Sequence, residues 1–256
     1  MNFGEIFKNS FKYPTLNFKK LLILGIFFLI YGILTALGTS DNSTLASLAV
    51  IFAIIALIVY VIIQGYTVDI IGISTTQKDE IPAINFKDNF VLGIKSFIVG
   101  IVYFIIPLII IFALAYLTVG FDYIVTIVTK TNLSNIPDNI ALVFAGSLAF
   151  IVVISVILFI IFSLVSTIAF GKLGKTGSLK EACSIGTVIN ETKEVGFLSI
   201  FGYVIVLGVI DVILGVISAS IIVLIPIIGF IISVLIIVPY ISMFNARVIG
   251  LIYSKV

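Results

Sequence analysis

Histidine and tryptophan are absent from the sequence, and Cys183 is the only cysteine. A single thiol excludes a disulfide within the chain, and without histidine there is no imidazole metal site and no histidine-based catalytic triad. A Gly-rich phosphate loop, paired catalytic carboxylates and a serine-nucleophile motif are also lacking. We therefore expect a protein that is not an enzyme and has no catalytic, cofactor-binding or metal-binding residues.

Charge is scarce as well. Charged residues make up only 10% of the 256 residues, whereas soluble domains contain about 25%. Hydrophobic residues make up 61%, and the mean hydropathy is +1.37. The formal net charge of +2, without a long run of one sign, excludes nucleic acid as an expected partner. The partner that this composition implies most directly is membrane lipid.

The apolar residues are gathered in blocks long enough to cross a bilayer as helices, which takes about 20 residues. No alternation of apolar and polar residues typical of a membrane β-barrel is present. We therefore predict an all-α, polytopic transmembrane helix bundle that forms a single integral membrane domain over residues 1–256. Its six predicted spans are residues 21–37, 45–63, 97–118, 141–162, 197–217 and 227–244.

The basic residues predict the orientation of these spans, because Lys and Arg near span ends are retained on the cytoplasmic side. With six spans, all but one of the 14 basic residues fall in segments on the same side, and the exception is Lys130. We expect a multi-pass protein of the cell membrane with both termini in the cytoplasm. The sequon that begins at Asn132 is then external, where it is a candidate for glycosylation.

Amphipathic segments predict interfacial helices at residues 3–12, 84–96, 121–129 and 178–190. Three of them precede a pair of spans, which is the pattern of three repeats of an interfacial helix plus a helical hairpin. Aligning the even-numbered spans on their glycines Gly72, Gly171 and Gly250 brings Asp69, Ile168 and Arg247 into register. The alternative stays open that lipid-facing helices resemble one another only in composition.

Several sequence blocks resemble a known membrane-protein family. They are residues 64–72 (QGYTVDIIG), 81–88 (IPAINFKD), 93–95 (GIK) and 102–107 (VYFIIP), with Gly4-Glu5-Ile6 and Tyr13-Pro14 ahead of the first span. Together they are similar to the mostly archaeal family called domain of unknown function 4013. Asp69 departs from one common form of the block, which carries an Arg after the Tyr of the second span. The resemblance implies a membrane location and brings no activity, substrate or catalytic residue.

Asp211 lies in the middle of the fifth predicted span, where a charged side chain costs at least about 2.5 kcal/mol. Gly208, Asp211, Gly215 and Ser218 are spaced three or four residues apart and form one small, polar stripe. We expect this stripe to face a neighbouring helix, because small residues permit close approach. It is either a proton- or cation-linked site, with Tyr103, Ser155 or Tyr240 as partners of Asp211, or a protonated Asp211 making one interhelical hydrogen bond.

Asp69 and Arg247 lie near the cytoplasmic ends of the second and sixth predicted spans. We expect them to form an ion pair that fixes helix packing, and the alternative is a cytoplasmic gate.

Two functions remain open. The first is a non-catalytic membrane module that organises lipids or partner proteins, including a second copy of the chain or another membrane protein. The second is a small-solute or ion transporter that uses Asp211. An enzyme acting within the membrane would need a cluster of polar groups, and only scattered ones are visible.

Overall fold

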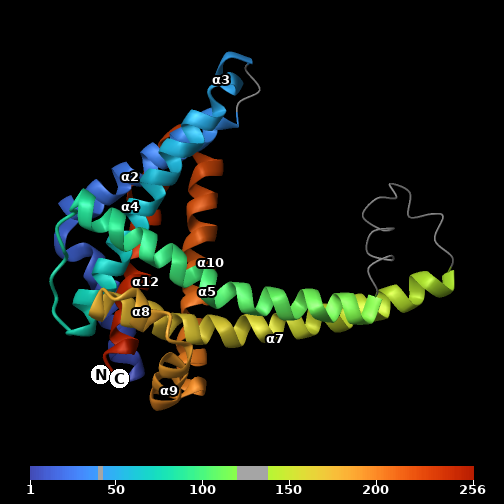
Figure 1. The fold of residues 1–256 in the computed structure, drawn as a ribbon. Helices are drawn as coiled ribbons and strands as arrows, with labels where there is room; N and C mark the ends of the chain where they lie inside the picture. The colour runs from blue at the N-terminus through green and yellow to red at the C-terminus, as the bar shows by residue number, and fades with distance from the viewer. Residues whose placement is uncertain (40–42, 120–137) are drawn as a thin grey trace. The chain divides into compact units, whose positions relative to one another are not determined.

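The computed structural model describes residues 1–39, 43–119 and 138–256, and this part of the chain is helical without strands (Figure 1). Six helical stretches are long and apolar enough to cross a membrane: Phe3–Gly38, Ala49–Thr75, Phe86–Thr118, Gly146–Thr176, Phe197–Leu224 and Pro226–Tyr253. The prediction of an all-α membrane protein with six spans is therefore confirmed. The interfacial helix expected at 121–129 and the sequon at Asn132 lie outside the described residues.

The elements follow in this order: α1 (Phe3–Lys12), η1 (Tyr13–Asn17), α2 (Phe18–Gly38), α3 (Ser43–Ser47), α4 (Ala49–Thr75), α5 (Phe86–Val119), α7 (Asp138–Thr176), α8 (Leu179–Ala182), α9 (Ile185–Val195), α10 (Phe197–Leu224), α11 (Pro226–Ile232), the π-helical turn η3 (Ser233–Ile237) and α12 (Val238–Tyr253). The N-terminal helix begins with a capping box. The Asn2 side chain accepts a hydrogen bond from the Glu5 backbone N–H, and the Glu5 carboxylate accepts one from the Asn2 backbone N–H.

The predicted interfacial segments differ in whether they form separate helices. The segment at 3–12 coincides with α1. Residues 84–96 do not form a separate helix, because α5 runs without a break from Phe86 through the third predicted span. Residues 178–190 are divided between α8 and α9, since the chain leaves the helix around Cys183 and Ser184.

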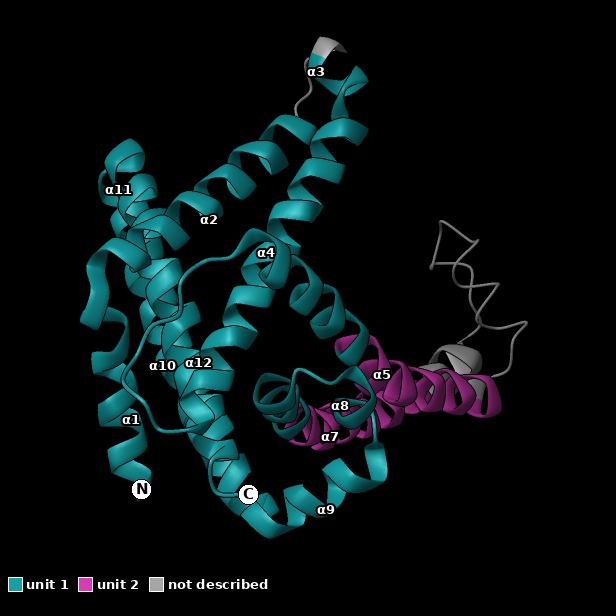
Figure 2. Ribbon diagram, turned by 60° about the vertical axis from the view of Figure 1, so that its left-hand side comes forward, with its two compact units in different colours: residues 1–99, 167–256 teal, residues 100–166 magenta. Residues whose placement is uncertain are grey.

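The chain forms two compact units, which Figure 2 colours separately. Unit 1 comprises residues 1–99 and 167–256, and unit 2 comprises residues 100–166. The expectation of one integral membrane domain stays a prediction.

Unit 1 has a buried core in which α2, α4 and α12 meet (Figure 2). The residues at its centre are mostly apolar: Tyr13, Leu21, Leu24, Ile63, Tyr66, Ile70, Ile71, Ile81, Met243 and Ala246. Two tyrosine hydroxyls of this core donate hydrogen bonds to the segment between α4 and α5. Tyr13 Oη donates to the Glu80 carbonyl at 2.6 Å, and Tyr66 Oη donates to the Pro82 carbonyl at 3.2 Å. These contacts hold residues 76–85 against the core.

The three glycines aligned from the sequence all lie at close helix crossings in unit 1. A Cβ on Gly72 of α4 would overlap the Gly174 carbonyl of α7, and one on Gly171 of α7 would overlap the Tyr253 side chain of α12. A Cβ on Gly250 of α12 would overlap the backbone and a serine of α4. Each of the three helices thus presents its glycine to the next in a closed cycle. The threefold repeat itself stays a prediction.

Unit 2 contains the parts of α5 and α7 between residues 100 and 166. Within it, the rings of Phe104 and Phe159 lie 6.3 Å apart. Many of its described large apolar side chains are exposed, including Phe112 at 65% and Leu117 at 78%. Both termini lie at the same end of unit 1 (Figures 1 and 2), which we call the terminal end.

Candidate functional site

Arg247 is the centre of the most connected polar cluster at the terminal end. Its side chain is fully buried, although it lies on the last helix, α12. Nε donates a hydrogen bond to Asn9 Oδ1 at 2.8 Å, Nη1 donates to the Lys78 carbonyl at 2.6 Å, and Nη2 pairs with Asp79 Oδ1 at 2.5 Å. The guanidinium also lies 4.7 Å from the centroid of the Tyr13 ring. This arginine cluster joins α1, η1, the 76–85 segment and α12.

The prediction that Arg247 pairs with Asp69 is wrong, because its acidic partner is another residue. Arg247 pairs with Asp79, because the segment that follows α4 returns over α12 and brings its backbone and carboxylate to the guanidinium. Asp69 is hydrogen-bonded by the side chain of Asn89 in α5. Sequence register alone placed Asp69 and Arg247 at the same level. The missed signal is the acidic pair Asp79 and Glu80 in the segment between α4 and α5.

Asp211 is engaged by a residue that the sequence did not single out. The Asn245 amide of α12 donates to both carboxylate oxygens, at 3.1 Å to Oδ1 and 2.9 Å to Oδ2. The hydroxyl of Tyr240, one predicted partner, donates instead to the Phe11 carbonyl at 2.8 Å. The other two predicted partners, Tyr103 and Ser155, belong to unit 2. Asn245 Oδ1 is buried and has no hydrogen-bond partner in the described part of the chain.

The rest of the polar stripe is open. Gly208 and Gly215 are exposed, and a Cβ on either would meet no atom of the described residues within 4 Å. The Ser218 carbonyl accepts a 3.4 Å hydrogen bond from the Ser233 hydroxyl. The expectation that the stripe packs closely against a neighbouring helix is therefore wrong at its two glycines among the described residues, and the contact that Asp211 makes with α12 comes from the Asn245 side chain.

Lysine side chains are also tied to the bundle at the terminal end. Lys172 is buried and forms a 2.7 Å ion pair with Glu191 of α9, whose other oxygen accepts a hydrogen bond from Tyr253 Oη at 3.3 Å. Lys255 Nζ donates to Tyr203 Oη at 2.8 Å. The α9 helix and the C-terminus are thus fastened to α7 and α10 by charged groups.

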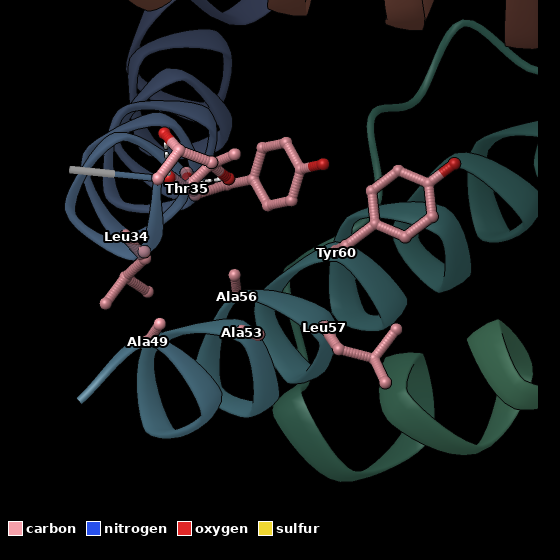
Figure 3. A pocket seen from close by; sticks show the side chains of 10 residues that line it. Leu34, Thr35, Ala49, Ala53, Ala56, Leu57 and Tyr60 are labelled. Atoms are coloured by element: carbon pink, nitrogen blue, oxygen red, sulfur yellow. Dashed lines mark hydrogen bonds between the residues drawn. The ribbon is translucent and has the colours of Figure 1, made fainter. Parts of the chain in front are cut away.

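Unit 1 contains a pocket of about 290 Å³ between α2 and α4 (Figure 3). Tyr31 and Tyr60 stand on opposite helices with their ring centroids 5.6 Å apart, and a row of alanines on α4 forms another part of the lining. Among the described residues of the lining, the polar side-chain groups are the hydroxyls of these tyrosines and of Thr35 and Thr39, and none is charged.

A second pocket, of about 360 Å³, lies where α2 begins, and we call it the basic pocket. Its lining combines polar and apolar side chains from the start of α2 and from the segment before α5: Asn17, Lys19, Lys20, Ile23, Phe27, Ala83, Ile84 and Phe86. The rings of Phe27 and Phe86 lie 5.6 Å apart. No group of three or more Cys, Asp or Glu residues within the described ranges is placed to hold a metal ion.

A comparison with protein families matches residues 48–223 to the family described as "Protein of unknown function (DUF4013)". The match covers more than half of the chain, so the chain belongs to this family. It begins just before α4 and ends within α10, so the arginine cluster and the basic pocket draw residues from both inside and outside the matched range. The searches of curated proteins and of solved structures found no match.

Proposed function

We propose that this member of the DUF4013 family is a non-catalytic module of the cell membrane that organises lipids or partner proteins at the cytoplasmic surface. The observation that carries the proposal is the burial of Arg247, which fastens the amphipathic helix α1 to the bundle. An amphipathic helix held in this way presents a fixed surface at the membrane boundary.

That surface has the composition of a membrane interface. Exposed aromatic and aliphatic side chains alternate there with lysines, and together they form what we call the N-terminal platform: Phe3, Phe11, Leu16 and Phe18, with Lys8, Lys12 and Lys19. Aromatic rings favour the headgroup level of a bilayer, and lysines near the surface attract anionic lipids. The platform therefore supports selective binding of lipids, or of a partner protein that carries acidic groups.

Lipid selectivity of the purified, reconstituted protein tests this proposal. We expect the protein to enrich anionic over zwitterionic lipids around itself in mixed vesicles, as measured by the lipids that remain bound after detergent extraction. The double variant Lys8→Gln, Lys12→Gln removes two exposed charges outside the arginine cluster, and it should reduce this enrichment without unfolding. Lys180→Gln, an exposed lysine outside the platform, is the matched control. Equal retention of both lipid classes by the unaltered protein, together with failure to co-purify a partner, contradicts the proposal.

The cytoplasmic placement is tested with Cys183, the only thiol, which lies between α8 and α9. An impermeant maleimide should label it in right-side-out vesicles only after permeabilisation. Burial raises the pKa of the thiol, so the reactive thiolate is scarcer at neutral pH and labelling should accelerate as the pH rises. Labelling of intact vesicles as fast as of permeabilised ones would show that Cys183 lies on the outside and would contradict the predicted orientation.

A transporter that uses Asp211 is the second candidate, favoured by one observation. Asn245 Oδ1 is buried beside the Asp211 carboxyl, and none of the described residues donates a hydrogen bond to it. A proton on Asp211 would supply such a donor after rotation of the amide, which is how a proton-linked site in a membrane is built. For this candidate, Asp211→Asn in liposomes should abolish solute or proton flux while the fold is kept. Unchanged flux removes Asp211 from any transport mechanism.

A further inference from the structure

The basic pocket changes from polar to apolar along one face of α2. Lys19, Ile23 and Phe27 are each four residues apart, so they lie on the same side of the helix and span about 12 Å along its axis. The opposite wall is formed by the segment that leads into α5, and it ends at Phe86 beside Phe27. A ligand that fills this pocket meets charge at one end and hydrocarbon at the other.

The charged end is suited to an anion. Lys20 Nζ donates a hydrogen bond to the Ile81 carbonyl, which fixes its position in the pocket wall. Lys19 is exposed and forms no ion pair with any residue that the structure describes. None of the described residues that line the pocket is acidic, and the N-terminus of the 21-residue helix α2 adds its positive dipole there.

The apolar end of the pocket favours a lipid over a soluble anion as the ligand. A free phosphate would use only the lysines and leave the walls formed by Ile23, Phe27 and Phe86 unoccupied. The volume of about 360 Å³ holds about a dozen groups of the size of a water molecule, which exceeds one phosphate. The pocket also lies where the chain enters the first apolar span, the level at which headgroups meet acyl chains. By contrast, the described residues that line the pocket between α2 and α4 are all uncharged.

We propose that the basic pocket is a binding site for one anionic phospholipid, with its phosphate at Lys19 and Lys20 and the first part of an acyl chain between Phe27 and Phe86. This inference rests on the proposed function and names the lipid class that a single site of the module recognises.

Native mass spectrometry of the full chain, titrated with phosphatidylglycerol or phosphatidylcholine, tests the site. We expect one tightly bound phosphatidylglycerol and weaker phosphatidylcholine. Lys19→Gln should weaken phosphatidylglycerol binding about fivefold, the contribution of one lysine near a membrane surface. Phe86→Ala should weaken binding of both lipids, because Phe86 contacts the acyl chain in the proposed site. Both side chains are exposed, Phe86 at 63%, so neither change should unfold the protein. Lys180→Gln, an exposed lysine outside both the pocket and the N-terminal platform, is the matched control and should leave this binding unchanged.

The source of the anion is decided by competition. Inorganic phosphate and glycerophosphoglycerol, which lack acyl chains, should not displace the bound lipid at millimolar concentration. Displacement by either, or equal affinity in Lys19→Gln and the unaltered protein, overturns the inference. If anionic lipid is still enriched in vesicles while these pocket variants have no effect, the site is wrong and the proposed function stands. If the unaltered protein shows no anionic preference at all, both fail.

Discussion

Unit 1 and unit 2 are both made of apolar helices, but they differ in what their helices bury. Unit 1 buries polar and charged side chains together with its apolar core, including Arg247, Lys172 and Asn89. The described part of unit 2 presents many of its large apolar side chains outward, as at Phe112 and Leu117. Outward apolar side chains also occur in unit 1, as at Leu198 and Ile227, so the contrast lies in the buried polar contacts that hold the helices of unit 1 together.

The physical reason lies in the solvent. Lipid tails are as apolar as leucine side chains, so apolar contact alone gives helices little reason to associate within a membrane. Close backbone approach and interhelical polar contacts supply that reason instead. Unit 1 contains both, in its glycine crossings and in the arginine cluster. The contrast between the units therefore predicts which substitutions will lower the free energy of unfolding.

Loss of the arginine cluster should have the largest effect. Arg247→Met removes three hydrogen bonds and leaves Asn9 and Lys78 without their donor. Breaking a buried ion pair costs about 3–5 kcal/mol, and we expect the lower part of this range because the Asp79 side chain is 60% exposed and can be rehydrated. The free energy of unfolding in detergent micelles measures the loss, and Lys8→Met on the exposed face of α1 is the control.

Hydrogen exchange localises the same change. Exchange should increase in α1 and in residues 76–85, while the parts of α5 and α7 in unit 2 keep their protection. An equal increase in both units would contradict the division drawn above.

A methyl group at a glycine crossing should have the next largest effect. Gly72→Ala forces α4 away from the Gly174 carbonyl, and overpacking of this kind costs about 1–3 kcal/mol. Gly100→Ala in unit 2 is the matched change, because a Cβ there meets no described atom within 4 Å. It should cause no loss of stability, as measured by the same unfolding assay. Equal losses at the two glycines would show that close packing does not distinguish the units.

The contact between Asp211 and Asn245 should have the smallest effect. A double-mutant cycle with Asp211→Ala and Asn245→Ala should give a coupling of about 0.6 kcal/mol, which is typical of polar pairs between membrane helices. A coupling well above about 1.7 kcal/mol would place this pair among the main stabilising contacts of unit 1. A value near zero would leave Asp211 without a structural role and sharpen the case for transport.

The sequence predicted close helix contacts well at positions where only the small size of a residue matters. Gly72, Gly171 and Gly250 were aligned by pattern, and all three lie at helix crossings because only a residue without a side chain lets backbones approach so closely. The same reasoning failed for Gly208 and Gly215, where an added Cβ would meet no atom of the described residues within 4 Å. Whether a small residue is used for packing depends on which face of a helix meets another.

The partners of the charged residues could not be predicted for a related reason. Arg247 requires a carboxylate and Asp211 requires a donor, and the residue types alone indicate this. That Asp79 and Asn245 fill these roles depends on how residues 76–85 fold back and on the rotation of α12 about its axis. Neither is encoded in the hydropathy or the spacing of a single span.

The sequence by itself determined the solvent of this protein, its helical class and its six spans, because long uncharged apolar blocks have only one stable form in hydrocarbon. Only the tertiary structure decided which polar groups meet, which glycines are covered and where lysines border an apolar pocket. Those outcomes depend on contacts between residues as far apart as Asn9 and Arg247, and local pattern carries no information about such distances.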